Sequence, residues 1–111
     1  MIIDTLSDNF LQTYGGEEGL IQRQSLLGAH LHDLALLALQ DDMAVVVTNT
    51  VRARMGDSCE VIEIGGNTVA QGLHKRVHLT HIEGRRVARL IHRPLGMREA
   101  YFRIGEAGIT D

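Results

Sequence analysis

Two short apolar segments flank one long amphipathic segment, and this order constrains the fold more than any other feature of the sequence. Residues 1–5 (MIIDT) and 43–48 (MAVVVT) are continuous apolar runs, typical of strands buried in a parallel sheet. Between them, apolar side chains recur at helical spacing over roughly residues 18–40, which predicts a helix packed on that sheet. A strand, a helix and a strand in this order predict two parallel strands joined by a right-handed crossover, with the second strand in the sheet's centre.

The rest of the chain predicts loops and an antiparallel region. Residues 10–16 and 49–64 lack sustained periodicity and are interpreted as loops, and a short helix is expected over about residues 68–73. Strands at 77–81 and 86–92 flank the turn residues Glu83 and Gly84, which favours a hairpin in which Ile82 pairs with Arg85. That register puts four apolar side chains on one face: Val77, Leu79, Ala88 and Leu90. A last strand is expected at residues 100–104.

Length and composition limit the class of protein. The 111 residues fit one domain on the usual scale of roughly 100–200 residues, and 44% apolar residues suffice for a core. A single cysteine, Cys59, excludes an internal disulfide, and no apolar run approaches the roughly 20 residues that cross a bilayer. We therefore expect a cytoplasmic α/β protein that has no membrane partner.

Charge is distributed unevenly along the chain. Residues 1–50 carry one basic and seven acidic side chains, whereas residues 51–111 carry ten and seven. Within residues 74–103 there are eight Lys or Arg, two acids and four histidines, a density that suits binding of a polyanion. A solvated face of an antiparallel sheet accounts equally well for this pattern.

The sequence contains no phosphate-binding loop. There is no G-x-x-x-x-G-K-[ST] motif, and Lys75 is the only lysine, so this chain by itself is not a complete P-loop ATPase. Asp4 nevertheless stands at the end of an apolar strand, where such enzymes place the acid that holds Mg²⁺. An acid at a strand end is common, and by itself it indicates little.

Several segments together are far more specific. The chain resembles the C-terminal half of the RecA-family recombinase core, most closely the archaeal RadA and RadB type, and the half with the phosphate-binding loop is missing from the resemblance. The matching segments, in order, are 2–5 (IIDT), 23–24 (RQ), 45–49 (VVVTN), 64–67 (IGGN), 84–91 (GRRVARLI) and 99–109 (EAYFRIGEAGI). The resemblance thus implies a partial RecA-like P-loop NTPase core over residues 1–111, with parallel strands, a packed helix and an antiparallel C-terminal hairpin region.

The resemblance also implies a function and a set of site residues. Family members are ATP- and Mg²⁺-dependent DNA-binding proteins that self-assemble and act in homologous recombination and DNA repair. Asp4 would hold Mg²⁺ through water when ATP is present, with neither expected to bind tightly to this chain alone. The other nucleotide-associated residues would be Thr48, Asn49, His92, Arg93 and Pro94. The residues that the resemblance implies contact DNA, single-stranded or double-stranded, are Arg23, Arg52, Arg54, Gly65, Gly66 and Asn67.

Some positions depart from the family pattern. Thr50 replaces the glutamine that senses the γ-phosphate, which predicts weaker coupling between nucleotide and DNA. The resemblance implies that residues 10–16 and 51–64 are the two DNA-facing loops. The family's first loop usually carries arginines, whereas Glu17 and Glu18 stand at its end here, which predicts weaker DNA affinity. His92 replaces an aspartate in the segment that caps a neighbouring subunit's nucleotide, and the basic pair His92 and Arg93 resembles RadB-like paralogues more than RadA.

Two hypotheses remain at the sequence level. The first is a recombinase of this type, or its C-terminal half, although this chain alone is expected not to hydrolyse ATP. The second is a non-catalytic module that associates with a full-length recombinase subunit and regulates it. In either case the missing strand would leave unpaired backbone groups between the parallel strands and the hairpin, which predicts a marginally stable monomer or an oligomer. The histidines near the hairpin are not expected to form a metal site, because His78 and His81 fall on opposite faces.

Overall fold

The computed structural model describes residues 1–14, 16–53, 61–92 and 96–111, which form two compact units. The first unit is Met1–Gly72 and the second is Leu73–Asp111, and each is described by itself. In the described part of the chain, no helix is both long and apolar enough to span a bilayer. The mixture of parallel strands, helices and an antiparallel C-terminal sheet confirms the expected α/β class.

A parallel strand pair opens the first unit. β1 (Ile2–Ile3) pairs with β2 (Val46–Val47), with Ile2 opposite Val46 and Ile3 opposite Val47, so the predicted parallel arrangement is confirmed. The expectation of buried strands with β2 at the centre of the sheet is wrong for the described residues, where β2 pairs with β1 alone. Ile2 is 76% exposed and Val46 is 55% exposed, because alternate side chains of a strand point to opposite faces and one face here lies open.

Three helices accompany this pair: α1 (Asp8–Thr13), α2 (Leu20–Gln40) and α3 (Gly66–Gly72). The loop expected at residues 10–16 is therefore wrong in its first part, since α1 extends through Thr13. The helix begins after Ser7, with Asp8 in its first turn, and the Leu11 N–H donates to the Ser7 carbonyl at 3.0 Å. A six-residue helix is too short for hydrophobic periodicity to reveal.

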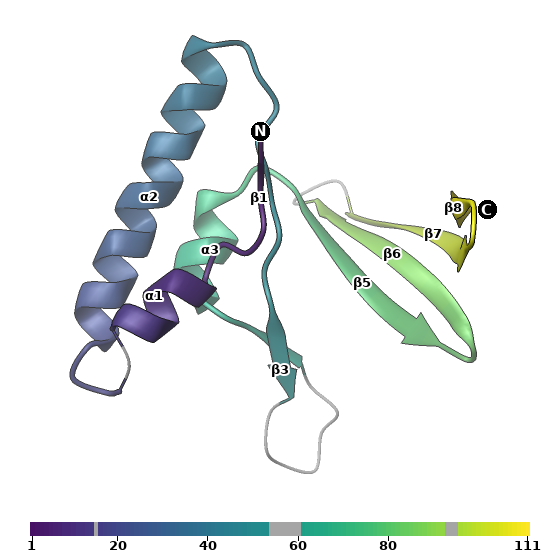
Figure 1. Cartoon of the computed structure of the whole chain (residues 1–111), viewed down its shortest axis with the longest axis horizontal. Coiled ribbons are helices and arrows are strands. Elements are labelled where there is room, and N and C mark those ends of the chain that lie inside the picture. The colour runs from purple at the N-terminus through teal and green to yellow at the C-terminus, as the bar shows by residue number, and fades with distance from the viewer. Residues whose placement is uncertain (15, 54–60, 93–95) are drawn as a thin grey trace. The chain divides into compact units, whose positions relative to one another are not determined.

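The core of the first unit lies between α2 and α3. Leu27 and Leu31, from the middle of the predicted apolar stripe, are buried, and Val69 of α3 is buried as well. Figure 1 shows α2 as the long helix beside α1 and α3. Within the stripe, Leu34 and Ala38 are half-buried, whereas Leu20 at the start of the helix is exposed. The apolar stripe thus predicted the packed face correctly in its central turns.

A short hairpin replaces much of the loop that was expected at residues 49–64. β3 (Val51–Ala53) pairs antiparallel with β4 (Val61–Glu63), and Arg52 lies opposite Ile62. Residues 54–60 lie outside the described residues. The loop interpretation is wrong at both of its ends, because two three-residue strands are too short to show an alternating pattern of their own.

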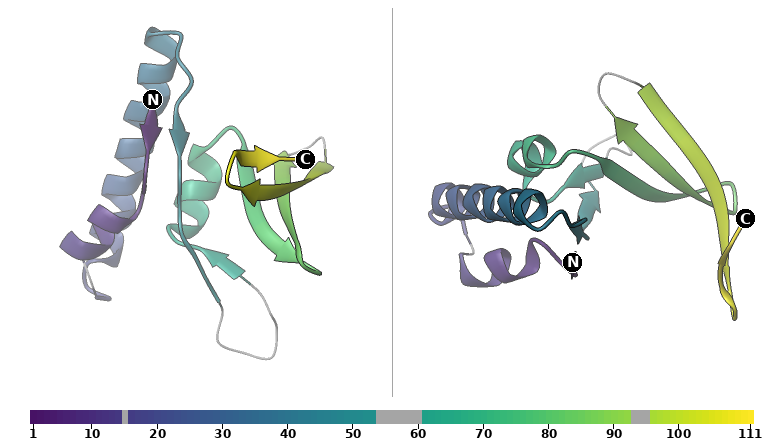
Figure 2. Two further views of the ribbon diagram at one scale, coloured as in Figure 1. Left: turned by 45° about the vertical axis from the view of Figure 1, so that its right-hand side comes forward. Right: turned by 90° about the horizontal axis from the view of Figure 1, so that it is seen from above.

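The second unit is a four-stranded antiparallel sheet in the order β5-β6-β7-β8 (Figure 2). Its strands are β5 (Arg76–Ile82), β6 (Arg85–His92), β7 (Gly96–Gly105) and β8 (Gly108–Thr110). Ile82 pairs with Arg85, which confirms the predicted register. Glu83 and Gly84 both have positive φ, 49° and 78°, the conformation that a tight two-residue hairpin requires. β7 begins earlier than the predicted 100–104 strand, and β8 was not predicted.

Candidate functional site

Asp4 and Thr48 meet at one edge of the parallel strand pair. Each follows its strand directly, and the carboxyl ends of parallel strands lie at the same edge. The Thr48 hydroxyl donates a hydrogen bond to Asp4 Oδ1 at 2.5 Å, and both residues are exposed. The Thr48 N–H donates to the Ile3 carbonyl at 2.9 Å, which fixes the two chain segments against each other. The arrangement presents an oriented carboxylate to solvent at the edge where ligands bind in open α/β sheets.

Asn49 joins this edge to the base of the β3–β4 hairpin. Its Nδ2 donates to the Ile64 carbonyl at 2.7 Å, and its Oδ1 accepts from the Ser7 hydroxyl at 2.8 Å. The Ile64 N–H in turn donates to the Thr50 carbonyl at 3.1 Å. Since Asn49 adjoins Thr48, side-chain and backbone bonds form one continuous path from Asp4 to the end of β4.

Ser7 belongs to this path but was not expected to. In the sequence it reads as the first residue of a polar turn cluster, Ser7-Asp8-Asn9. In the structure it is buried and orients the Asn49 amide. Nothing in its sequence neighbourhood indicates this role, because its partner lies 42 residues away.

The glycines predicted to face DNA have different structural reasons for being glycine. A Cβ on Gly65 would lie 2.4 Å from Val69 Cγ2 and 2.9 Å from Leu27 Cδ2, and its φ is +90°. Gly66 has a φ of +51° but open space around it, and Asn67 is exposed in the first turn of α3. Packing against α2 and α3 therefore accounts for Gly65, and backbone conformation accounts for Gly66. Their proposed DNA contacts remain predictions.

The predicted arginines occupy distinct environments. Arg23 is half-buried in α2, and its Nη1 donates to the Tyr14 carbonyl at 2.8 Å, which ties the end of α1 to the start of α2. Arg52 is exposed on β3. Arg54 lies outside the described residues. Of the two predicted arginines that the structure describes, Arg52 is the one that is exposed to solvent. Contact with DNA remains a prediction for each arginine.

The segment expected to cap a nucleotide is described only at its start. His92 ends β6, and Arg93 and Pro94 lie outside the described residues. His92 belongs to the second unit, whereas Asp4, Thr48 and Asn49 come together within the first. Among the residues that the structure describes, no group of three or more His, Cys, Asp or Glu side chains forms a metal cluster.

Comparison with known proteins identifies the family. The sequence model of the Rad51 family matches residues 1–111. This chain belongs to the Rad51 family. The DNA repair and recombination protein RadA of Metallosphaera sedula is 38% identical to it over 117 aligned residues, covering the whole chain and 36% of that relative. The chain therefore spans about a third of the length of the curated relative that it matches.

Membership of the Rad51 family confirms the resemblance that the six ordered segments indicated. The RecA-like core is inferred from the family, and the parallel pair with its packed helices agrees with that inference. Family membership does not assign a function to any single residue of this chain. The contacts of Asp4, Thr48 and Asn49 are the structural evidence for the functions proposed below for these residues.

Proposed function

We propose that this chain forms the C-terminal half of the ATPase core of a RadA-type DNA repair and recombination protein, where it links one side of an ATP–Mg²⁺ site to a DNA-facing hairpin. The observation that carries the proposal is the hydrogen-bonded path from Asp4 through Thr48 and Asn49 to Ile64, in a chain that belongs to the Rad51 family.

The donor chemistry at the edge of the strand pair fits a hydrated Mg²⁺ ion. An exposed carboxylate and hydroxyl offer the oxygen atoms that Mg²⁺ prefers, and Mg²⁺ keeps several of its waters when it binds to protein. Asp4 would hold the ion, and Thr48 would orient the Asp4 carboxylate. When bound with ATP, Mg²⁺ neutralises charge on the β- and γ-phosphates.

Asn49 would couple the edge that holds Asp4 and Thr48 to the hairpin that faces DNA. Its Nδ2 bond to Ile64 ties the segment after β2 to the end of β4, so a shift of Thr48 would displace the base of the β3–β4 hairpin. Its Oδ1 accepts from Ser7, which ties the same segment to the start of α1. Thr50 lacks the amide that family members use at this position. Coupling in this chain would therefore run through Asn49 and the backbone bond between Thr50 and Ile64.

The β3–β4 hairpin would contact the DNA backbone. Arg52 is exposed on β3, and a guanidinium engages phosphate through a fork of N–H donors. Arg54, two residues further on, would extend the same contact, and Asn67 at the exposed start of α3 would add an amide. Phosphate contacts of this kind position a protein on DNA without reading its sequence.

The decisive experiment is a salt titration of the 111-residue chain with a fluorescent oligo-dT, followed by anisotropy. Arg52→Ala should weaken binding and make the log-log salt slope shallower by roughly one phosphate's share, about 0.7 for single strands. Arg103→Ala, at an exposed position of β7 in the second unit, is the matched control and should have a smaller effect. Equal losses in both variants would count against the hairpin as the DNA-facing element.

A second candidate function is a non-catalytic module that regulates a full-length recombinase subunit. The acidic pair Glu17 and Glu18, just before α2, favours it, because these carboxylates repel DNA phosphates. A salt slope near zero, with Arg52→Ala neutral, would support this module and contradict DNA binding. The chain alone should release no phosphate from ATP in either case, and measurable turnover would overturn both candidates.

A further inference from the structure

The short helix α1 contributes no buried side chain to the first unit. None of its six residues, all of them in the described part of the chain, is buried. A helix of this length is not stable by itself, so contacts with other segments must hold it in place. The Phe10 ring lies against His30 with ring centroids 5.7 Å apart, and the Tyr14 carbonyl accepts the hydrogen bond from Arg23. Both contacts join α1 to α2, and neither involves the residue after which α1 starts.

Ser7 links the start of α1 to the segment after β2. A serine at the start of a helix usually caps it by accepting a hydrogen bond from an N–H of the first turn. Within the described residues, the Ser7 side chain makes no such capping bond. Its hydroxyl lies 2.8 Å from Asn49 Oδ1 instead, and Ser7 is 2% exposed. The Ser7 hydroxyl therefore joins two distant segments and leaves its own helix uncapped.

The chemistry of the Asn49 amide fixes the direction of both of its hydrogen bonds. The Ile64 carbonyl only accepts, so the end of the amide that lies 2.7 Å from it is Nδ2. The other end is then Oδ1, which cannot donate, so the Ser7 hydroxyl is the donor. Removal of the hydroxyl would leave Oδ1 without this donor at a part-buried position. It would also remove one of the two interactions that hold the amide in this orientation.

We propose that Ser7 is a positioning residue that couples α1 to the β3–β4 hairpin through the Asn49 amide. The Ser7 hydroxyl holds Oδ1, Nδ2 holds the Ile64 carbonyl, and the Ile64 N–H donates to the Thr50 carbonyl at the base of the hairpin. All of these contacts lie within the first unit. The consequence for DNA rests on the proposed function, in which the hairpin faces DNA, whereas the coupling itself does not.

Amide hydrogen exchange of the 111-residue chain, measured by NMR, tests the coupling in the absence of DNA. Ser7→Ala should lower the protection of the Ile64 N–H about tenfold, because a buried acceptor that loses its donor destabilises the structure around it. The Leu31 N–H in the middle of α2 reports opening of the first unit as a whole, and its protection should fall less than about threefold. The Asn49 Nδ2 protons, identified by their loss in Asn49→Asp, should exchange faster in Ser7→Ala.

The coupling is tested from its other end as well, because coupling free energies are reciprocal. Asn49→Ala should lower the protection of the Leu11 N–H, which donates to the Ser7 carbonyl at the start of α1. This variant leaves Ser7 intact and keeps the test valid if Ser7→Ala does not fold. The double variant Ser7→Ala with Asn49→Ala should lose no more Ile64 protection than Asn49→Ala alone, since both substitutions act through one hydrogen bond.

Thr13→Ala is the matched control. It removes a hydroxyl from the same helix, but the Thr13 hydroxyl donates to the Asn9 carbonyl at 3.0 Å and so bonds within α1. Its effect on Ile64 protection and on the Asn49 Nδ2 signals should be negligible.

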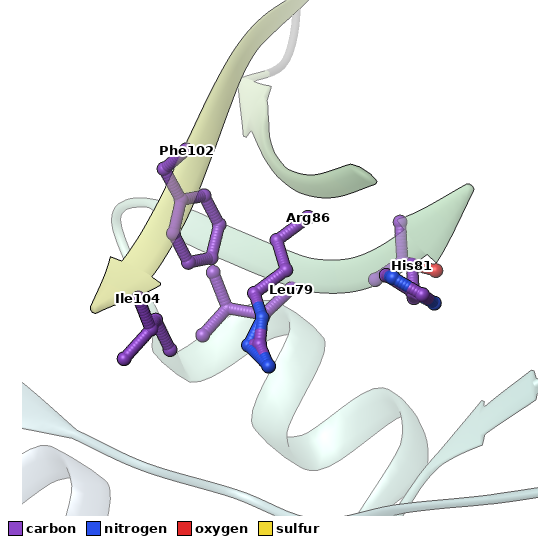
Figure 3. Close-up of a pocket in the computed structure, with 6 residues that line it drawn as sticks. Leu79, His81, Arg86, Phe102 and Ile104 are labelled. Carbon is purple, nitrogen blue, oxygen red and sulfur yellow. The ribbon is translucent and has the colours of Figure 1, made fainter. Parts of the chain in front are cut away.

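A second control lies in the second unit, which contributes none of the hydrogen bonds of the proposed path. Ile104 is 59% exposed and lines a shallow pocket of about 460 Å³ on the sheet. Figure 3 shows Ile104 extending from β7 near Phe102. Ile104→Ala should leave the protection of both Ile64 and Leu11 unchanged.

Binding of fluorescent oligo-dT separates a positioning residue from a phosphate contact. Ser7→Ala should weaken binding about three- to tenfold and leave the log-log salt slope unchanged, because an uncharged side chain releases no counterion. Arg52→Ala should make that slope shallower, and Thr13→Ala should bind as tightly as the unmodified chain.

Three outcomes would overturn the coupling: unchanged Ile64 protection in Ser7→Ala, an equal loss in Thr13→Ala, or equal losses at Ile64 and Leu31 in Ser7→Ala. Failure of the proposed function is recognised separately. If the unmodified chain does not bind oligo-dT, the DNA contact fails and the exchange data still decide the coupling. If Arg52→Ala lowers the salt slope while Ser7→Ala changes neither exchange nor affinity, the coupling fails and the proposed DNA contact stands.

Discussion

Each of the two units of this chain is stabilised internally by a different kind of interaction. In the first unit, Leu6, Leu27, Leu31, Val69 and Ser7 are buried, and side-chain hydrogen bonds join segments far apart in sequence. In the second unit, Val87 is the buried residue among those that the structure describes. Its strands are joined by backbone ladders along β5, β6, β7 and β8.

This difference bears on how far each unit can be stable by itself. The first has helices that cover one side of a strand pair, and its polar groups are organised around Asp4 and Asn49. The second is a single layer, and a sheet becomes stable when one face packs against another layer. The second unit is therefore expected to depend on a covering partner more than the first, and four measurements test that contrast.

The largest expected effect is loss of the buried leucine in the first unit. Leu27→Ala removes a side chain that is 2% exposed and should lower the free energy of unfolding by about 2–5 kcal/mol. Urea unfolding followed by circular dichroism at 222 nm, which is dominated by α2, measures the loss. Val87→Ala in the second unit should reduce the helical transition much less. Equal losses would mean that the two units unfold as one.

The next effect concerns close packing at Gly65. A Cβ there would collide with Val69 and Leu27, and the positive φ adds strain, so Gly65→Ala should cost about 2–4 kcal/mol by the combination of overpacking and backbone strain. Gly66→Ala has the same kind of backbone but open space, and should cost about 1–2 kcal/mol. The same urea titration compares them. Similar costs would show that backbone conformation alone decides both positions.

A smaller effect should follow from the open strand edges. In the described residues, β2 pairs only with β1 and β5 only with β6, which leaves backbone groups available to a second chain. If two chains associate through these edges, each tenfold rise in protein concentration should add about 1.4 kcal/mol of apparent stability. Differential scanning calorimetry at several concentrations measures the shift. A sharp melt that is independent of concentration would argue for a self-sufficient monomer.

The smallest effect is expected at the surface of the second unit. Arg89 pairs with Glu99 across β6 and β7 at 2.7 Å, and their side chains are 29% and 34% exposed. Solvent screens such a pair, so Arg89→Ala should cost less than about 1 kcal/mol, and the cost should fall in high salt. Lys75→Ala is the control, because Lys75 is exposed and lies before β5, outside the paired strands β6 and β7. A loss above that of Leu27→Ala would reverse the contrast between the units.

The fold was predictable where the sequence carries a clear period or turn. The stripe around Leu27 and Leu31 predicted the packed face of α2, and Glu83 with Gly84 predicted the hairpin and its register. Short elements were not predictable, because α1, β3 and β4 contain too few residues for a period to show. The openness of β2 was also missed, since an apolar run does not reveal how many neighbours a strand has.

The candidate site was predictable in part. Asp4, Thr48 and Asn49 were expected from the ordered family segments, and the structure brings these three together. Ser7 could not be predicted, since its function as a hydrogen-bond donor to Asn49 exists only after residues 42 apart meet. The hydrogen bond from Arg23 to the Tyr14 carbonyl could not be predicted either, because the sequence of residues 10–16 does not indicate that α1 ends there.

The sequence by itself determined the family, the parallel pair, the long helix and the hairpin register, because each is encoded in local order or spacing. The tertiary structure alone decided which glycine is needed for packing and which serine orients an amide. Those properties depend on contacts between distant segments, and the free energy of such a contact is absent until both segments are in place.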